Sequence, residues 1–155
     1  MPGFEKTPRY ILKLIHFPPR LAYVIGLGPL VGKIILLLTT RGRRTGKPRV
    51  TPLQYEEIDG RYYVTSALGG KADWVRNLKS NPQVKVQVKS RKFGGTAEII
   101  EDPIQIADFL ETRLSRHPRM VGAILKAEGI SLPPTRRELE TYAKKRILVV
   151  IQPDM

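Results

Sequence analysis

The stretch that decides the fold is LLLTTRGRRTGKPRVTPLQY, residues 36–55. Its first residues belong to a β-prone, apolar run, residues 34–40, in which polar and apolar side chains do not alternate. Such a run is typical of a strand that is covered on both faces. The nine residues that follow hold five cations and two glycines. We therefore expect a buried strand that leads directly into a short, strongly cationic loop.

Patterns on the C-terminal side of this loop predict further strands. Asp59 and Gly60 lie between two β-prone segments and indicate a two-residue hairpin, because glycine tolerates a positive φ. Residues 83–89, QVKVQVK, alternate apolar and polar side chains, as a strand with one wet face does. Gly94 and Gly95 precede its expected partner and permit a bend or bulge there. Strands are expected at residues 34–40, 50–58, 61–67, 83–89, 95–100 and 146–153.

Helical spacing predicts the remaining elements. Trp74, Asn77 and Leu78 share one face of a short helix. Thr135 and Glu138 form a capping-box pattern at the start of another helix. Helices are expected at residues 10–17, 71–80, 103–116, 120–129 and 136–145. About six mostly antiparallel strands with these helices indicate an α+β domain, in which the sheet curls into a barrel and helices are packed on it or inserted between strands.

The composition excludes several kinds of site. The chain has no cysteine, which removes disulfides, thiol nucleophiles and thiolate metal ligands. Its two histidines, His16 and His117, lack a spacing that indicates a metal site or a catalytic triad. We therefore expect no metal. The net charge of +13 favours polyanions, anionic ligands or an anionic membrane surface as partners.

The N-terminal residues predict a segment of different character within the same domain. Residues 10–17, YILKLIHF, have the pattern of a basic amphipathic helix. The uncharged run 21–32 is shorter than the roughly twenty residues that cross a bilayer, and no signal-peptide cleavage pattern is visible. We expect a cytoplasmic protein with one domain, residues 1–155, in which the helical segment 1–33 packs on the barrel or extends from it. The segment also predicts peripheral contact with anionic membranes on the cytoplasmic face.

The cationic loop, residues 41–49, carries the main indication of function. Its arginines offer planar forks matched to phosphate and carboxylate groups, and its glycines allow a tight backbone turn. The order of residues is neither a P-loop nor a dinucleotide-binding glycine fingerprint. We expect a ligand with several separated negative charges. The alternative is that a basic chain clusters some cations on a solvated turn by chance.

Two segments, LLLTTRGRRTGKPRVTPLQY and GRYYVTSALGGKADWVRNLKSNPQVKVQV, together resemble the deazaflavin-dependent oxidoreductases. This family includes the deazaflavin-dependent nitroreductases and is related to the flavin-binding split β-barrels. The features that carry the resemblance are TT-x-GR-[RK]-[ST]-G-x-PR-x-x-PL and W-x-x-N-L-x-x-NP-x-V, between residues 34 and 98. The resemblance implies a split β-barrel that holds reduced coenzyme F420, a deazaflavin with an acidic phosphate and polyglutamate tail.

The resemblance also implies roles for individual residues. The expected coenzyme-binding residues are Arg43, Arg44, Thr45, Lys47, Arg49, Pro52, Leu53, Thr65, Ser66, Ala67, Trp74 and Asn77. Those of the cationic loop would grip the phosphate and the tail, with Lys47 the least certain of them. The proline and leucine would border the ring, the strand end would contact it, and the tryptophan and asparagine would close that side. The candidate proton donors are Ser66, Tyr55 and solvent.

Each of these residues also has a purely structural interpretation. Trp74 fits a core position equally well, and Asn77 fits a hydrogen-bonding position near a helix end. Ser66 fits a strand-end hydroxyl, and Tyr55 fits barrel packing. The chain departs from the family in two places. The segment ALGGKADW is shorter than in several family members, and the C-terminal third contains one tyrosine, Tyr142, where several members have more. The acceptor is therefore the least defined part of the resemblance.

The resemblance implies an oxidoreductase that moves a hydride from reduced F420 to an electron-poor small molecule, such as a quinone, an activated alkene or a nitro compound. The coenzyme supplies the chemistry, which suits a chain without cysteine. FMN is the less favoured cofactor, and a homodimer stays open. The rival is a nonenzymatic protein, either a flavin or deazaflavin carrier or a nucleic-acid-binding barrel. Because adjacent Tyr62 and Tyr63 face opposite sides of a strand, a base-stacking platform is poorly supported, and we expect no nucleic acid.

Overall fold

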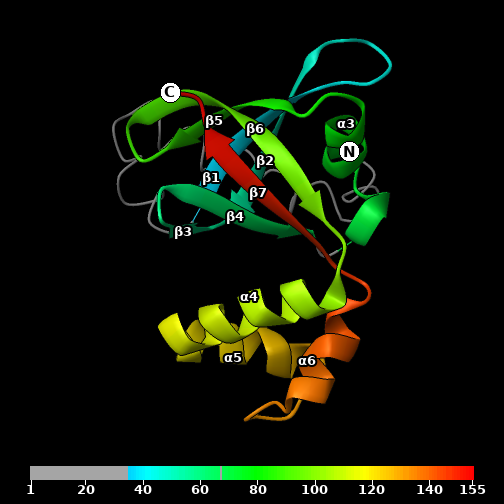
Figure 1. Ribbon diagram of the computed structural model, residues 1–155, viewed down its shortest axis with the longest axis vertical. Helices are drawn as coiled ribbons and strands as arrows, with labels where there is room; N and C mark the ends of the chain where they lie inside the picture. The colour runs from blue at the N-terminus through cyan, green and yellow to red at the C-terminus, as the bar shows by residue number, and fades with distance from the viewer. Residues whose placement is uncertain (1–34, 67) are drawn as a thin grey trace, which may run out of the picture.

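The computed structural model describes residues 35–66 and 68–155 (Figure 1). The predicted N-terminal segment, residues 1–33, and Ala67 lie outside the described residues. The strands are β1 (Ile35–Arg41), β2 (Pro48–Gln54), β3 (Glu56–Ile58), β4 (Arg61–Ser66), β5 (Gln83–Val88), β6 (Arg91–Ile100) and β7 (Ile147–Pro153). The helices are α3 (Asp73–Ser80), α4 (Pro103–Arg116), α5 (Pro118–Ala127) and α6 (Arg136–Ala143), and a 3-10 turn, η2 (Gly69–Lys71), precedes α3. Within the described ranges, no helix combines the length and the apolar character needed to cross a bilayer.

The seven strands form one antiparallel sheet in the order β2-β1-β5-β6-β7-β4-β3. Its two edge strands, β2 and β3, are consecutive in the chain, and only Tyr55 lies between them. The sheet therefore curls round until its edges approach each other, as the upper part of Figure 1 shows. The segment predicted as one strand, residues 50–58, is divided at Tyr55 because β2 pairs with β1 whereas β3 pairs with β4. This division accounts for the strand beyond the expected six.

The interior of the barrel is filled by aliphatic side chains from opposite strands. Leu36, Leu37 and Leu38 of β1 are buried in succession, which confirms the expectation of a strand covered on both faces. The three valines of β5 are buried while Lys85 between them is exposed. This alternation confirms that one face of β5 is wet.

Helices α4, α5 and α6 form a layer against the outer face of the barrel, below it in Figure 1. Leu148 and Val150 of β7 belong to the core that these helices share with the sheet. Ile147, Val149 and Ile151 of the same strand point into the barrel core. β7 is therefore covered on both faces, and it separates the two cores. The helical residues of the outer core are Ile106, Ala107, Phe109, Leu110, Val121, Leu125, Leu139 and Ala143.

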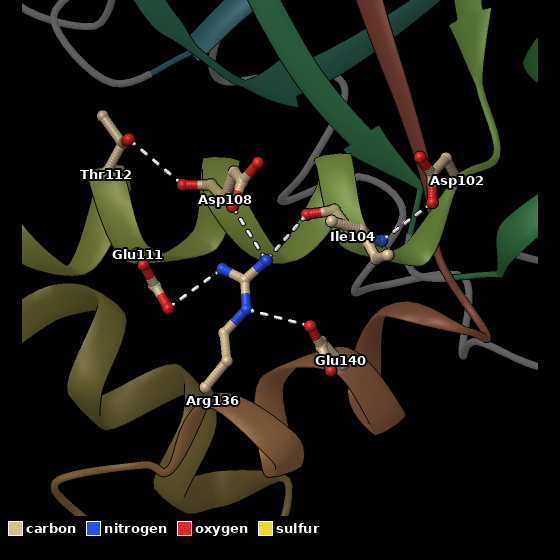
Figure 2. A network of polar contacts seen from close by, with 7 residues as sticks. All are labelled: Asp102, Ile104, Asp108, Glu111, Thr112, Arg136 and Glu140. Atoms are coloured by element: carbon tan, nitrogen blue, oxygen red, sulfur yellow. Dashed lines mark hydrogen bonds and ion pairs between the residues drawn. The ribbon is translucent and has the colours of Figure 1, made fainter.

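Arg136 at the start of α6 connects this helix to α4 (Figure 2). Its guanidinium lies 2.8 Å from Oδ1 of Asp108 and 3.0 Å from Oε1 of Glu111, both on α4. It also lies 3.1 Å from Oε1 of Glu140 and donates to the carbonyl of Ile104 at 3.2 Å. The hydrogen bonds to Glu111 and then to Glu140 are the main reasons why the pKa of Arg136 is raised above its usual value. One side chain thus holds two helices of the layer together.

Two local predictions are confirmed by backbone geometry. Asp59 and Gly60 have φ values of 52° and 79°, the left-handed pair that a tight hairpin turn requires. The amide of Glu138 donates to Oγ1 of Thr135 at 3.1 Å, and the amide of Thr135 donates to Oε1 of Glu138 at 3.1 Å. The predicted capping box therefore opens α6.

The predicted bend or bulge at Gly94 and Gly95 takes a different form. The register between β5 and β6 runs unbroken past both glycines, with Val84 opposite Gly95. A Cβ atom at Gly95 would lie 2.8 Å from the carbonyl oxygen of Gln152 in β7. The register therefore shows no bulge at these glycines, and the missing side chain of Gly95 allows close approach of β7 to β6.

Candidate functional site

The cationic loop between β1 and β2 closes on itself through its backbone. The amide of Gly42 donates to the carbonyl of Lys47, and the amide of Gly46 donates to the carbonyl of Gly42, both at 2.8 Å. Gly46 has a φ of 71°, which glycine adopts without strain. The hydroxyl of Thr45 accepts from the amide of Lys47 at 3.2 Å. The loop is therefore a compact turn held by its backbone hydrogen bonds and by the hydroxyl of Thr45.

Arg43 fastens this loop to helix α3. Its Nη1 atom donates to Oδ1 of Asn77 at 2.9 Å, and its backbone amide donates to the same oxygen at 3.2 Å. Its Nη2 atom lies 3.0 Å from Oδ1 of Asp73. Asn77 is buried, and its Nδ2 atom donates to Oγ1 of Thr40 at 3.3 Å. Arg43 and Asn77 were both predicted to contact the ligand, and in the structure they are hydrogen-bonded to each other.

A cavity of about 530 Å³ opens between the loop, β2 and α3. Four arginines and one aspartate line it, and the aspartate is already paired with Arg43. Arg44, Arg49 and Arg76 have no carboxylate partner among residues 35–66 and 68–155. Three arginines without a carboxylate partner in the described part of the chain therefore line one cavity, an arrangement that suits a multiply charged anion. The lining residues are Gly42, Arg43, Arg44, Thr45, Arg49, Thr51, Asp73, Trp74, Arg76 and Asn77.

A second cavity, of about 260 Å³, lies between the barrel and the helical layer. It contains the predicted ring contacts Pro52, Leu53 and Thr65. The lining residues are Pro52, Leu53, Gln54, Thr65, Ile106, Leu110, Arg113, Val121, Ile124, Leu125, Glu128, Tyr142 and Arg146. The structure therefore brings the predicted site residues together in two groups, one in the cationic cavity and one in this apolar cavity.

Strand β2 connects the two cavities. Arg49 and Thr51 line the cationic cavity, and Leu53 lines the apolar one. Because side chains two residues apart lie on the same face of a strand, these three form one row. The row extends over about 13 Å, at about 3.3 Å for each residue. The row thus places an arginine at the cationic cavity and a leucine at the apolar cavity, with the buried Thr51 between them.

The remaining predicted residues occupy mainly structural positions. The hydroxyl of Ser66 is buried and donates to the carbonyl of Gly69 at 2.9 Å. The ring of Tyr55 packs on that of Tyr62, with 5.8 Å between their centroids. Neither Ser66 nor Tyr55 lines either cavity, so their role as proton donors stays a prediction. Lys47 is exposed and does not line the cationic cavity either.

Trp74 and Arg76 show what sequence reasoning found and what it missed. Trp74 is buried in the barrel core and also lines the cationic cavity, so its core interpretation is confirmed and its contact with the coenzyme stays a prediction. Arg76 lines the same cavity from α3, but it is not on the helix face that Trp74, Asn77 and Leu78 define. Its position one residue before a predicted contact was the only local signal for it.

The chain is similar to known proteins in sequence and in fold. The family model described as F420H(2)-dependent quinone reductase matches residues 24–119. An F420H(2)-dependent quinone reductase of Mycobacterium tuberculosis and one described as putative from Mycobacterium bovis are each 38% identical over 69 residues, which is 43% of this chain and 46% of the relative. The match thus spans less than half the length of these relatives.

Solved structures share the fold. An F420-H2-dependent reductase, FDR-A, is 25% identical and superposes with a TM-score of 0.52, covering 76% of this chain and 94% of that protein. A protein described as a domain-swapped dimer is 21% identical, with a TM-score of 0.56 and coverage of 94% and 100%. These likenesses confirm the predicted α+β split-barrel fold.

Proposed function

This chain belongs to the F420H(2)-dependent quinone reductase family, and from that premise we propose that it transfers a hydride from reduced coenzyme F420 to a quinone. Membership confirms the resemblance that the sequence carries, and the coenzyme in the family's name is the one that the resemblance implied. The observation that supports the activity for this chain is the cationic cavity, in which three arginines have no carboxylate partner among the described residues. A phosphate and several carboxylates match such donors better than the single phosphate of FMN does.

In this proposal the coenzyme lies along β2. Arg44, Arg49 and Arg76 hold the phosphate and the tail carboxylates, while Arg43 keeps the loop in place through Asp73. Pro52, Leu53 and Thr65, which line the apolar cavity, would border the deazaflavin ring. When bound, the coenzyme supplies the hydride, and the protein supplies orientation and a site with little water.

The proton that the reduced acceptor needs comes from solvent or from a side chain near the ring. Tyr55 and Ser66 stay candidates, and the hydroxyl of Ser66 is already engaged by Gly69. Replacing them separately, by Tyr55→Phe and Ser66→Ala, tests them. A donor would be identified by a loss of single-turnover rate without loss of coenzyme binding.

The test of the proposal is F420 binding, measured by quenching of the fluorescence of Trp74. Arg44→Ala, Arg49→Ala and Arg76→Ala are each expected to weaken binding by about 1.5–3 kcal/mol, roughly ten- to a hundredfold, because each removes a charge-assisted hydrogen bond. Lysine at these positions should restore part of the loss, since an ammonium cannot copy a planar fork. The matched control is Lys92→Ala, an exposed cation on β6, which should cost less than about 1 kcal/mol.

Two outcomes would contradict the proposal. Equal small losses in all four variants, fading with salt, would indicate a diffuse basic surface and would favour the nucleic-acid alternative. FMN binding as tight as that of F420 would indicate a general flavin barrel. At saturating coenzyme, menadione reduction should continue in the arginine variants, because the tail lies away from the hydride. Binding of F420 without any reduction would leave a carrier.

We also propose a homodimer, because a structural relative is described as a domain-swapped dimer. Light scattering on the purified chain tests it directly, and a monomer at micromolar concentration would contradict it. Membrane contact of the N-terminal segment falls on residues that the structure does not describe and stays a prediction. Co-sedimentation with anionic vesicles, with and without residues 1–19, decides it.

A further inference from the structure

Arg113, which lines the apolar cavity beneath the barrel, has a guanidinium nitrogen that the described residues leave without a hydrogen-bond partner. The cavity, of about 260 Å³, is lined by aliphatic side chains of β2, α4 and α5, with Arg113 among them. Its volume is slightly below the range of about 300–1,000 Å³ that is typical of drug-sized ligands. It therefore suits a small molecule of one or two fused rings.

Arg113 is held in place from the side of the barrel. Its Nε atom lies 3.4 Å from Oε1 of Glu56, a buried carboxylate on β3. Arg116 and His117 approach the same carboxylate, at 3.5 Å and 2.9 Å. The side chain of Arg113 is 10% exposed, and its Nη2 atom is buried without a hydrogen-bond partner in the part of the chain that the structure describes. A buried, unsatisfied guanidinium nitrogen is costly, so a ligand that accepts from it gains affinity.

The other charges at this cavity are mutually paired. Arg146 forms an ion pair with Glu128, and its guanidinium lies 4.2 Å from the ring centroid of Tyr142. Each lining arginine therefore contacts a carboxylate, although Glu56 is shared with Arg116, which leaves three arginines against two carboxylates. A strongly anionic ligand would find little net charge here, whereas an uncharged molecule with a carbonyl oxygen would find a positioned donor.

We propose that Arg113 donates a hydrogen bond to a carbonyl oxygen of the electron acceptor and is a specificity-determining residue for uncharged, planar, carbonyl-bearing acceptors. The identity of this ligand as the acceptor rests on the proposed function. The position is suitable because Leu53 and Thr65, which the coenzyme ring is expected to border, line the same cavity.

The proposed contact also fits the chemistry of the reduction. The acceptor gains two electrons and one proton with the hydride, which places negative charge on a carbonyl oxygen. A cationic donor already in position stabilises that charge without reorganisation. The oxygen then takes one proton from solvent, and the coenzyme, having lost the hydride, releases one proton to solvent. Atoms and charge therefore balance, and Arg113 itself neither gains nor loses a proton.

The experiment compares two ligands of the same shape on the full chain without coenzyme. Menadione is a methylated naphthoquinone, and methylnaphthalene has the same rings without the oxygens. Dissociation constants are measured by calorimetry for wild type, Arg113→Lys and Arg116→Lys. Arg116 is the matched control, because it contacts the same carboxylate but does not line the cavity.

We expect Arg113→Lys to weaken menadione binding roughly ten- to a hundredfold, because a lysine ammonium cannot copy the planar fork that places Nε on Glu56 and leaves Nη2 for the ligand, and a charged donor to the carbonyl oxygen is worth that much. Methylnaphthalene binding should be unchanged, and Arg116→Lys should leave both ligands unaffected. Unchanged menadione affinity in Arg113→Lys, equal losses for both ligands, equal effects of the two variants, or no menadione binding to wild type would each overturn the inference.

A measurement on the wild type covers the case in which Arg113→Lys does not fold. In protein with nitrogen-labelled arginine, the guanidinium resonance of Arg113 should shift on addition of menadione but not of methylnaphthalene. The absence of that difference would also overturn the inference. Because no coenzyme is present, these results are independent of F420 binding. A chain that binds menadione through Arg113 but does not bind F420 would refute the proposed function and leave this contact intact.

Discussion

Replacing Asn77 by alanine tests whether one buried amide holds the cationic loop to helix α3. The substitution removes two hydrogen bonds accepted from Arg43 and one donated to Thr40. At about 1 kcal/mol for each bond, the expected loss of unfolding free energy is about 3 kcal/mol. The estimate is not reduced for solvent screening, because Asn77 is 3% exposed and Thr40 is 1% exposed.

Urea denaturation measures this loss. With a slope of about 2 kcal/mol/M, the midpoint of Asn77→Ala should fall by about 1.5 M. The control is Asn81→Ala at the end of the same helix, where the amide oxygen accepts one exposed hydrogen bond from the amide of Gln83. That variant should lose less than about 1 kcal/mol. Equal midpoints for the two variants would refute the idea that Asn77 fixes the loop.

Two further substitutions test the packing of the sheet and of the helical layer. Gly95→Ala should lower the free energy of unfolding by about 1–3 kcal/mol, because the new Cβ meets the backbone of β7. Gly94→Ala is the control: its Cβ would meet the movable carboxylate of Asp154, so it should cost less in the same urea titration. Arg136→Ala should lower the melting temperature because it breaks the contacts between α4 and α6, and added salt should reduce the difference from wild type. The control Arg137→Ala, at an exposed position, should melt like wild type. Equal melting temperatures of the two variants would contradict the role of Arg136.

Features that depend on a few neighbouring residues were predictable from the sequence. The buried run of β1, the turn at Asp59 and Gly60 and the capping box at Thr135 all follow from local propensity and hydrogen bonding. The cationic cavity was predictable in part, because Arg44 and Arg49 lie in the same short loop. These features need no knowledge of how distant segments meet.

Features that depend on distant pairing were not predictable in this way. Arg43 lies in the same loop as Arg44, and only the position of Asn77, 34 residues later, makes it a structural contact. The contact between Glu56 and Arg113 joins residues 57 positions apart. Sequence patterns give the period of an element but not which elements pack together. The division of one expected strand at Tyr55 has the same cause, because the sheet changes partner there.

The central place of β7 has a consequence for how the protein is made. Tyr62 of β4 and Ala97 of β6 both pair with Ile151 of β7, so the ribosome synthesises two strands long before the one that joins them. Their facing edges keep unpaired backbone groups during that time, and such edges are prone to wrong pairing. Contacts so distant in sequence also slow folding, because the loop-closure entropy is lost before the sheet forms. The nascent chain therefore depends on residues 147–153 to join its two groups of strands into one sheet, however complete its hairpins already are.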